Sequence, residues 1–133
     1  MSDFEQISIH SGFMKHNGGL LFKVISETES EFKTKINENH LNRAGITHGG
    51  YIASIIDAGI GTGVHRANKN NIFVTISLDI KFIGSTKIGD EIIGKVKIEK
   101  ITNSLVFASC KIESKNKIIA VGSGVWKRTN NSF

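Results

Sequence analysis

One segment of this chain follows a different period from everything around it. Between residues 49 and 65 the apolar residues recur at the spacing of a buried helix face, at Ile52, Ile55, Ile56, Ile60 and Val64. On both sides of this segment, apolar and polar residues alternate instead, as they do in strands with one buried face. A chain of 133 residues suits a single domain with one core. The sequence therefore predicts one long central helix packed against a sheet.

Two strand patterns precede the helix and four follow it. The expected strands are residues 20–25, 32–36, 74–82, 92–99, 105–112 and 118–126. Gly, Asn, Asp and Ser separate them, because the chain has no proline to make its turns. This order predicts an α+β fold in which an antiparallel sheet of five to six strands wraps around one long central helix.

The predicted domain spans residues 19–128. Residues 1–18 form an N-terminal segment, in which residues 3–16 are expected to contain a helix with Phe4, Ile7 and Met14 facing inward. Residues 129–133 are expected to form a disordered tail. We find no repeat, linker or second domain in the pattern.

The composition is that of an ordinary soluble protein, with 39% hydrophobic and 22% charged residues. The net charge of +5 comes from lysines scattered along strands, which indicates a solvated sheet face rather than a nucleic-acid site. No stretch is apolar enough to span a membrane, and the first residues lack the order of a signal peptide. The lone Cys110 is predicted to be a buried thiol on an alternating strand. We expect a cytoplasmic protein without nucleic-acid or membrane partners.

The start of the helix combines two chemical groups. Gly49 begins the helix, so its N–H has no intrahelical partner and lies at the positive end of the helix dipole. A carbonyl oxygen that gains charge would be stabilised there. Asp57 lies two turns further on, on a face whose other members are small: Gly50, Ala53, Ser54 and Gly61. A face of this kind admits a substrate or a partner helix, and Asp57 is then expected to act as a base or nucleophile; a solvated or capping Asp57 is the alternative.

The spacing of these two groups has a consequence for assembly. Gly49 and Asp57 are eight residues apart, which is about 12 Å along a helix. One carbonyl carbon does not easily touch both groups. Two antiparallel copies of the helix would place Gly49 of one chain beside Asp57 of the other, so the sequence predicts a two-fold dimer with two composite sites.

Three further polar residues are candidates for the same site. His48 either orients the loop or touches the substrate, Asn42 either braces the loop or holds a carbonyl or a water, and Thr75 either bonds the attacking water or lies on an exposed sheet face. The five histidines show no paired spacing, so no metal site is expected. The sequence also lacks a Gly-rich phosphate loop of the P-loop or dinucleotide type and a serine nucleophile elbow. We expect no cofactor.

Taken together, these motifs resemble those of the hotdog-fold acyl-CoA thioesterases of the phenylacetic-acid-degradation (PaaI) type. The residues that carry the resemblance are Asn42, His48-Gly49-Gly50, Asp57, Val74-Thr75-Ile76, Gly89-Asp90 and Ala120-Val121-Gly122. The resemblance implies that Asp57 is the general base or nucleophile and that the Gly49 N–H stabilises the oxyanion. It also implies that Asn42 and His48 position the thioester and that Thr75 helps to hold the water. Chains of this family pair into dimers with a continuous sheet, often as homotetramers.

The substrate is expected to be an aryl- or medium-chain acyl-CoA. Gly50 and Ser54 lie on the open helix face, and Phe82 with Ile55, Ile56 and Ile60 would line an apolar tunnel. The chain departs from the family pattern at Ser85, where proline is usual, and at Thr102-Asn103, where Gly-Lys or Gly-Arg is frequent. Because both positions lie where the nucleotide of CoA tends to bind, its phosphate contacts stay open among Arg43, Arg66, Lys127 and Arg128.

Two other functions fit the same fold class. The first is a non-catalytic module that binds acyl-CoA or lipid, although such a module has no need of a carboxylate near a thioester. The second is a hydratase or dehydratase, which uses an Asp and a His a few residues apart. Here His48 and His65 are nine and eight residues from Asp57, so neither pair fits.

Overall fold

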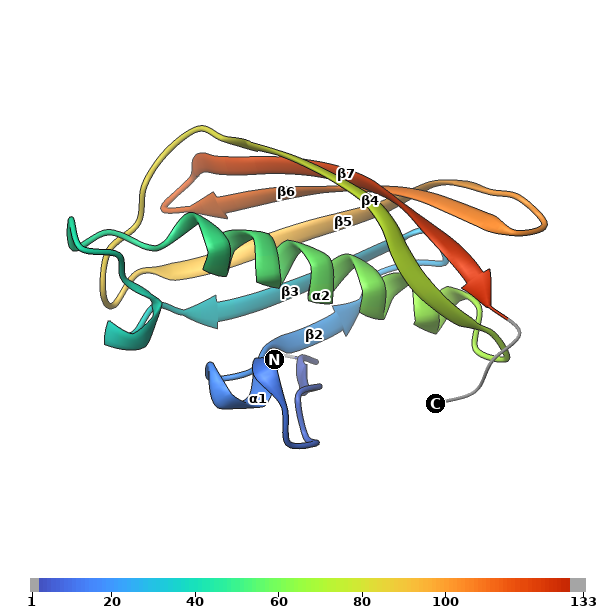
Figure 1. Ribbon diagram of the computed structural model, residues 1–133, viewed down its shortest axis with the longest axis horizontal. Coiled ribbons are helices and arrows are strands. Elements are labelled where there is room, and N and C mark those ends of the chain that lie inside the picture. The colour runs from blue at the N-terminus through green and yellow to red at the C-terminus, as the bar shows by residue number, and fades with distance from the viewer. Residues whose placement is uncertain (1–2, 130–133) are drawn as a thin grey trace.

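A single long helix crosses one face of a curved sheet in the computed structural model, which describes residues 3–129 (Figure 1). The helix, α2, spans Gly49–Ala67. The strands are β1 (Glu5–Gln6), β2 (Leu21–Val24), β3 (Glu29–Lys35), β4 (Ile72–Phe82), β5 (Glu91–Ile101), β6 (Leu105–Ser114) and β7 (Lys117–Thr129). Two short helical segments complete the chain, α1 (Phe13–His16) and the 3-10 helix η1 (Glu38–His40). The predicted α+β arrangement of an antiparallel sheet around one central helix is confirmed.

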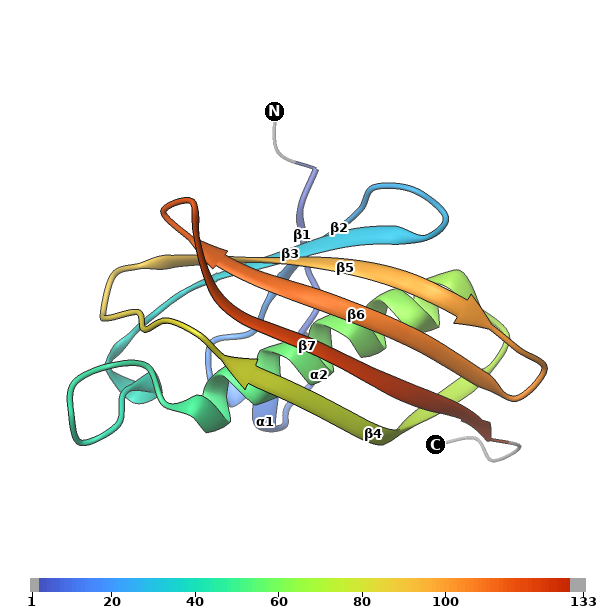
Figure 2. The same cartoon turned by 90° about the horizontal axis from the view of Figure 1, so that it is seen from above.

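The sheet has seven strands in the order β1-β2-β3-β5-β6-β7-β4, and every neighbouring pair is antiparallel. This is more than the five to six expected, because residues 5–6 add a short strand to the edge of β2. The predicted helix within residues 3–16 is therefore wrong for its first half and reduces to the four residues of α1. A strand of two residues is too short to show an alternating pattern of side chains. At the opposite edge lies β4, which follows α2 in the chain and runs beside β7 (Figure 2).

The core lies between α2 and the concave face of the sheet. The predicted apolar stripe of α2 is buried along its whole length: Ile52, Ile55, Ile56, Ile60 and Val64. Opposite this stripe the sheet contributes large side chains, among them Phe22, Phe32 and Trp126. Cys110 also faces the core, as predicted, and burial raises the pKa of its thiol to about 12. Its thiol is therefore neutral near pH 7 and acts as an apolar side chain.

A bulge in β4 decides which of its residues face α2. Thr75 pairs with Trp126 and Ser77 pairs with Val125, so Ile76 is the extra residue between them. Directly opposite residues share a face, and Trp126 is buried in the core, so Thr75 lies on the side of the sheet that faces α2. The alternation expected from the sequence is therefore wrong across the bulge. Strict alternation along residues 74–82 would place Val74 and Ile76 on the same side as Leu78, but they are 36% and 54% exposed.

The last strand is longer than predicted. It ends at Thr129, the first residue of the expected tail, and the other four residues of that tail lie outside the described part of the chain. None of the helices within residues 3–129 has the length and apolar character needed to cross a membrane.

Candidate active site

The first turn of α2 holds two hydrogen-bond donors that the fold does not use. His48 is the N-cap of α2, and its Nδ1 accepts the N–H of Gly50 at 2.7 Å. Because Nδ1 accepts, a neutral His48 carries its proton on Nε2. Within residues 3–129, neither the Gly49 N–H nor His48 Nε2 has a hydrogen-bond partner. The helix start can therefore donate to an oxygen of a bound molecule.

Glycine at position 50 is required by this cap. A Cβ at Gly50 would stand 2.9 Å from Nδ1 of His48, which is closer than such atoms approach. The Gly50 carbonyl is also engaged, because it accepts the hydroxyl of Ser54 at 2.8 Å. Both residues thus have structural roles at the helix start, and their contact with a substrate stays a prediction.

The loop before α2 is braced by Asn42. Its Oδ1 accepts the N–H of Ala44 at 2.9 Å and that of Ile46 at 3.4 Å, while its own N–H donates to the Ile46 carbonyl at 2.8 Å. The loop-bracing alternative for Asn42 is therefore present in the structure. Asn42 also lines a cavity of about 200 Å³ together with Gly49 and Phe82, so this loop residue and the helix start border the same cavity.

Asp57 and Thr75 come together although they lie 18 residues apart. The Thr75 hydroxyl donates to Oδ1 of Asp57 at 2.7 Å. Asp57 is half-buried and Thr75 is exposed, so the pair is open to solvent in a single chain. The second carboxylate oxygen of Asp57, Oδ2, has no hydrogen-bond partner among the described residues. An oriented carboxylate with one unused oxygen is suited to accept a proton or to attack a carbonyl.

One chain leaves the two halves of the predicted site apart. Because α2 is continuous, Gly49 and Asp57 are separated by about 12 Å along its axis. The cavity beside Gly49 has Phe82 and Ile52 in its wall but does not reach Asp57. The predicted apolar tunnel is wrong for Ile55, Ile56 and Ile60, which are 0% exposed in the core. These three side chains pack against the sheet, so within the described part of the chain they leave no open channel between the helix and the sheet.

A second histidine, which the sequence did not single out, supports the helix start. His40 is buried and stacks on the ring of Tyr51 with a centroid distance of 3.7 Å. Its Nε2 bonds the carbonyl of Asn17 at 2.7 Å, and its own carbonyl accepts the N–H of His48 at 2.7 Å. His40 therefore connects α1 to the first turn of α2. A histidine in a polar loop gives no sequence signal for such a position.

Of the four basic residues considered for phosphate contacts, Arg66 is already engaged. Its guanidinium lies 2.6 Å from the Glu5 carboxylate and sits over the Phe22 ring. The Thr102-Asn103 turn forms its own bonds, with the Thr102 N–H donating to the Leu105 carbonyl at 2.8 Å. Among residues 3–129 no three His, Cys, Asp or Glu side chains are grouped so that they could hold a metal ion.

Comparison with known proteins places this chain in a family. Residues 44–120, which include the helix start, Asp57 and Thr75, match the model of the thioesterase superfamily. The chain therefore belongs to the thioesterase superfamily, and the expectation of a thioesterase is confirmed. Acyl-coenzyme A thioesterase 13 of the mouse is 31% identical over 90 residues, which cover 66% of this chain and 64% of that protein. The chain thus aligns with just under two thirds of this relative's length.

Solved structures share the whole fold. Zebrafish thioesterase superfamily member 2 superposes with a TM-score of 0.83 over 92% of this chain and 90% of its own, at 22% identity. A mutant of the phenylacetic acid degradation protein PaaI from Thermus thermophilus gives a TM-score of 0.79 over 87% and 97% of the two chains, at 16% identity. At these identities the likeness shows the fold, and it confirms the hotdog arrangement.

Proposed function

We propose that this protein hydrolyses acyl-CoA thioesters to a free acid and CoA, in sites that two copies of the chain form together. The observation that carries the proposal is the Asp57–Thr75 hydrogen bond, which holds a carboxylate on the open face of α2 in a member of the thioesterase superfamily. A relative named as an acyl-coenzyme A thioesterase supports CoA as the thiol.

Each predicted residue then has a defined part in the reaction. The thioester carbonyl oxygen accepts the Gly49 N–H, which stabilises the negative charge that develops as the carbon is attacked. His48 Nε2–H and the side-chain amide of Asn42 position the thioester. Asp57 accepts a proton from a water molecule that Thr75 helps to hold, the water oxygen bonds to the carbonyl carbon, the C–S bond breaks, and the departing thiolate takes up a proton.

Direct attack by Asp57 is the second form of the same step. The carboxylate oxygen would bond to the carbonyl carbon and expel the thiolate, and water would then hydrolyse the resulting anhydride. Single-turnover hydrolysis in ¹⁸O-labelled water separates the two forms. Label in the Asp57 carboxylate indicates the anhydride, because direct attack by water on the thioester carbon labels only the released acid.

The dimer is supported by the edge of the sheet. β4 is an 11-residue edge strand that carries the exposed side chains of Val74 and Ile76. Long apolar edges of this kind are usually covered by pairing. A second copy that pairs antiparallel along β4 extends the sheet and lays its α2 antiparallel to the first, which brings Gly49 of one chain towards Asp57 of the other. We expect such dimers to pair further into tetramers.

The acyl group is proposed to be aryl or medium-chain. The cavity beside Gly49 has a volume of about 200 Å³ and includes Phe82, Ile52 and Ile119. An apolar cavity of about 150 Å³ is enough for a benzene ring, so a compact aryl group fits a hollow of this size.

A panel of short, medium, long and aryl acyl-CoAs tests the proposal through release of the CoA thiol. The wild type should hydrolyse at least one of them, and Asp57→Ala should lower kcat by about 100-fold or more, as loss of a general base does. Asp79→Ala is the matched control, because Asp79 lies on β4 but pairs with Lys81 rather than with Thr75. If neither wild type nor Asp57→Ala releases thiol while both bind acyl-CoA, the protein is a binding module and the proposal is wrong.

A further inference from the structure

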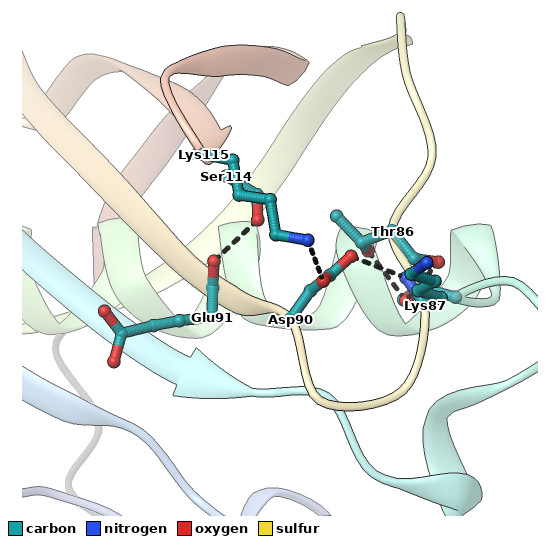
Figure 3. A network of polar contacts seen from close by, with 7 residues as sticks. Thr86, Lys87, Asp90, Glu91, Ser114 and Lys115 are labelled. Atoms are coloured by element: carbon teal, nitrogen blue, oxygen red, sulfur yellow. Dashed lines mark hydrogen bonds and ion pairs between the residues drawn. The ribbon is translucent and has the colours of Figure 1, made fainter.

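We propose that Thr86 is a positioning residue for the Gly49 amide, and that the Gly89-Asp90 motif acts by holding Thr86 in place. This inference rests on the proposed function, because it concerns the oxyanion-binding half of that site. Thr86 and the motif lie in the segment 83–90, which joins β4 to β5 and runs beside the loop that leads into α2 (Figures 2 and 3).

Thr47 and Thr86 connect these two segments. The Thr47 N–H donates to the Thr86 carbonyl at 2.8 Å, and the two hydroxyls are 2.7 Å apart. Both side chains are buried, with exposed fractions of 8% and 4%. Buried hydrogen bonds in a low-dielectric setting hold their geometry well. Since Thr47 is two residues before Gly49, this contact fixes the main chain that enters the first turn of α2.

The same segment also forms a wall around Gly49. Thr86 lines the same cavity as Gly49, together with Gly84 and Ser85. Phe82, the residue that ends β4, lies against Gly49 so closely that a Cβ there would be 3.4 Å from its ring. A displacement of segment 83–90 would therefore move the donor and the wall of its cavity together.

The Gly89-Asp90 motif anchors this segment to the sheet. Gly89 has φ of +88°, a conformation that glycine adopts without strain, and its N–H donates to the Ile36 carbonyl at 2.8 Å. The Asp90 carboxylate accepts the Lys87 N–H at 2.9 Å and lies 3.1 Å from Nζ of Lys115 (Figure 3). Residue 87 follows Thr86 directly. Asp90 thus fixes the main chain next to Thr86 and joins it to the turn between β6 and β7.

A positioning role has a kinetic signature. Donors to an oxyanion work only within about 0.5 Å of the productive geometry. A displaced Gly49 amide would lose contact with the charge that develops in the transition state, while ground-state binding of acyl-CoA would change little. Loss of the Thr86 hydroxyl should therefore lower kcat and leave KM nearly unchanged.

Thr86→Val and Thr86→Ser test this role, because valine keeps the shape of threonine and serine keeps its hydroxyl. We expect kcat to fall about 10-fold in Thr86→Val with KM within about twofold, and to stay within about threefold of wild type in Thr86→Ser. Ser109→Ala is the control, since the Ser109 hydroxyl donates to the Glu99 carboxylate at 2.9 Å between β6 and β5 and has no contact with the network around Thr86. Its kcat should match that of the wild type.

A second measurement does not depend on catalysis. Hydrogen exchange of the Thr47 amide, which donates to the Thr86 carbonyl, should be about 10-fold faster in Thr86→Val and unchanged in Thr86→Ser when it is followed by NMR. Equal kcat in wild type and Thr86→Val, equal losses in the two Thr86 variants, or a change confined to KM would overturn the inference. A wild type inactive on every acyl-CoA would overturn the proposed function itself. The exchange rates would then decide separately whether Thr86 holds the helix start.

Discussion

The two chemical groups on α2 are supported in very different ways. At the helix start, His48, Asn42, His40 and Thr47 each form hydrogen bonds that fix the turn carrying Gly49. Two turns further on, Asp57 has one bond, from Thr75, and faces an open surface of small residues. The chain therefore completes the donor half of the proposed site by itself and leaves the proposed carboxylate half open on one side. This difference is what a site shared between two copies would require.

Removing the Gly49 N–H should have the largest effect on kcat. Gly49→Pro deletes the N–H at the first position of the helix, where proline is well tolerated, and the extended backbone of His48 suits a following proline. We expect kcat to fall by about 10²- to 10³-fold with little change in Tm. Gly49→Ala, which keeps the N–H, is the control and should stay within about threefold of wild type. Similar losses in both variants would mean that the space at position 49 matters rather than the donor.

Mixing two inactive variants tests whether the halves come from different chains. Gly49→Pro and Asp57→Ala should each be inactive, but a heterodimer of the two has one site with both groups intact. After unfolding and refolding together at equal concentrations, activity should return to about a quarter of the wild-type value. Separately refolded samples, mixed just before the assay, are the control. No gain in the co-refolded sample would place both groups of a site on one chain.

Loss of the hydrogen bond from Thr75 to Asp57 should lower kcat less than loss of the Gly49 N–H or of the Asp57 carboxylate. Thr75→Val removes the hydroxyl that orients the carboxylate, and we expect kcat to fall about 10-fold because the carboxylate loses its orientation. Thr75→Ser should recover most of the loss. If Thr75→Val has wild-type kinetics, Asp57 needs no orientation beyond its place on the helix.

The smallest expected effect is on thermal stability, through the Asp90 carboxylate that anchors segment 83–90. The Lys87 N–H and the Lys115 ammonium hold the pKa of Asp90 below its ordinary value of 3.8. A lowered folded-state pKa stabilises the fold above the ordinary value, and this contribution is lost as pH falls through the folded-state pKa. Asp90→Asn should therefore lower Tm by a few degrees at pH 7, with a difference that narrows below pH 3.8. Both lysines stay charged over this range, so a difference that did not narrow would exclude the Asp90 carboxylate as its source.

Local periodicity explains which parts of the fold the sequence predicted. The stripe of α2 and six of the strands were predictable because helix and strand periods are read from neighbouring residues. β1 was not, because Glu5 and Gln6 pair through their backbone at the edge of the sheet. The Asp57 and Gly49 candidates followed from the helix geometry alone. The Thr47–Thr86 contact joins residues 39 positions apart and depends on the return of β4 alongside the helix start, which no local pattern contains.

The bulge at Ile76 also affects how related chains should be compared. Thr75 and Leu78 face α2 from the same side of β4, although an odd number of positions separates them in the chain. An alignment that counts residues along this strand therefore shifts Thr75 to the wrong face whenever a relative lacks the extra residue. Alignment by pairing partners on β7 avoids the error, because in this chain Thr75 lies opposite Trp126 and Ser77 lies opposite Val125. In an alignment of β4, a gap of one residue at the bulge therefore changes which side chains face α2, just as a substitution changes their chemistry.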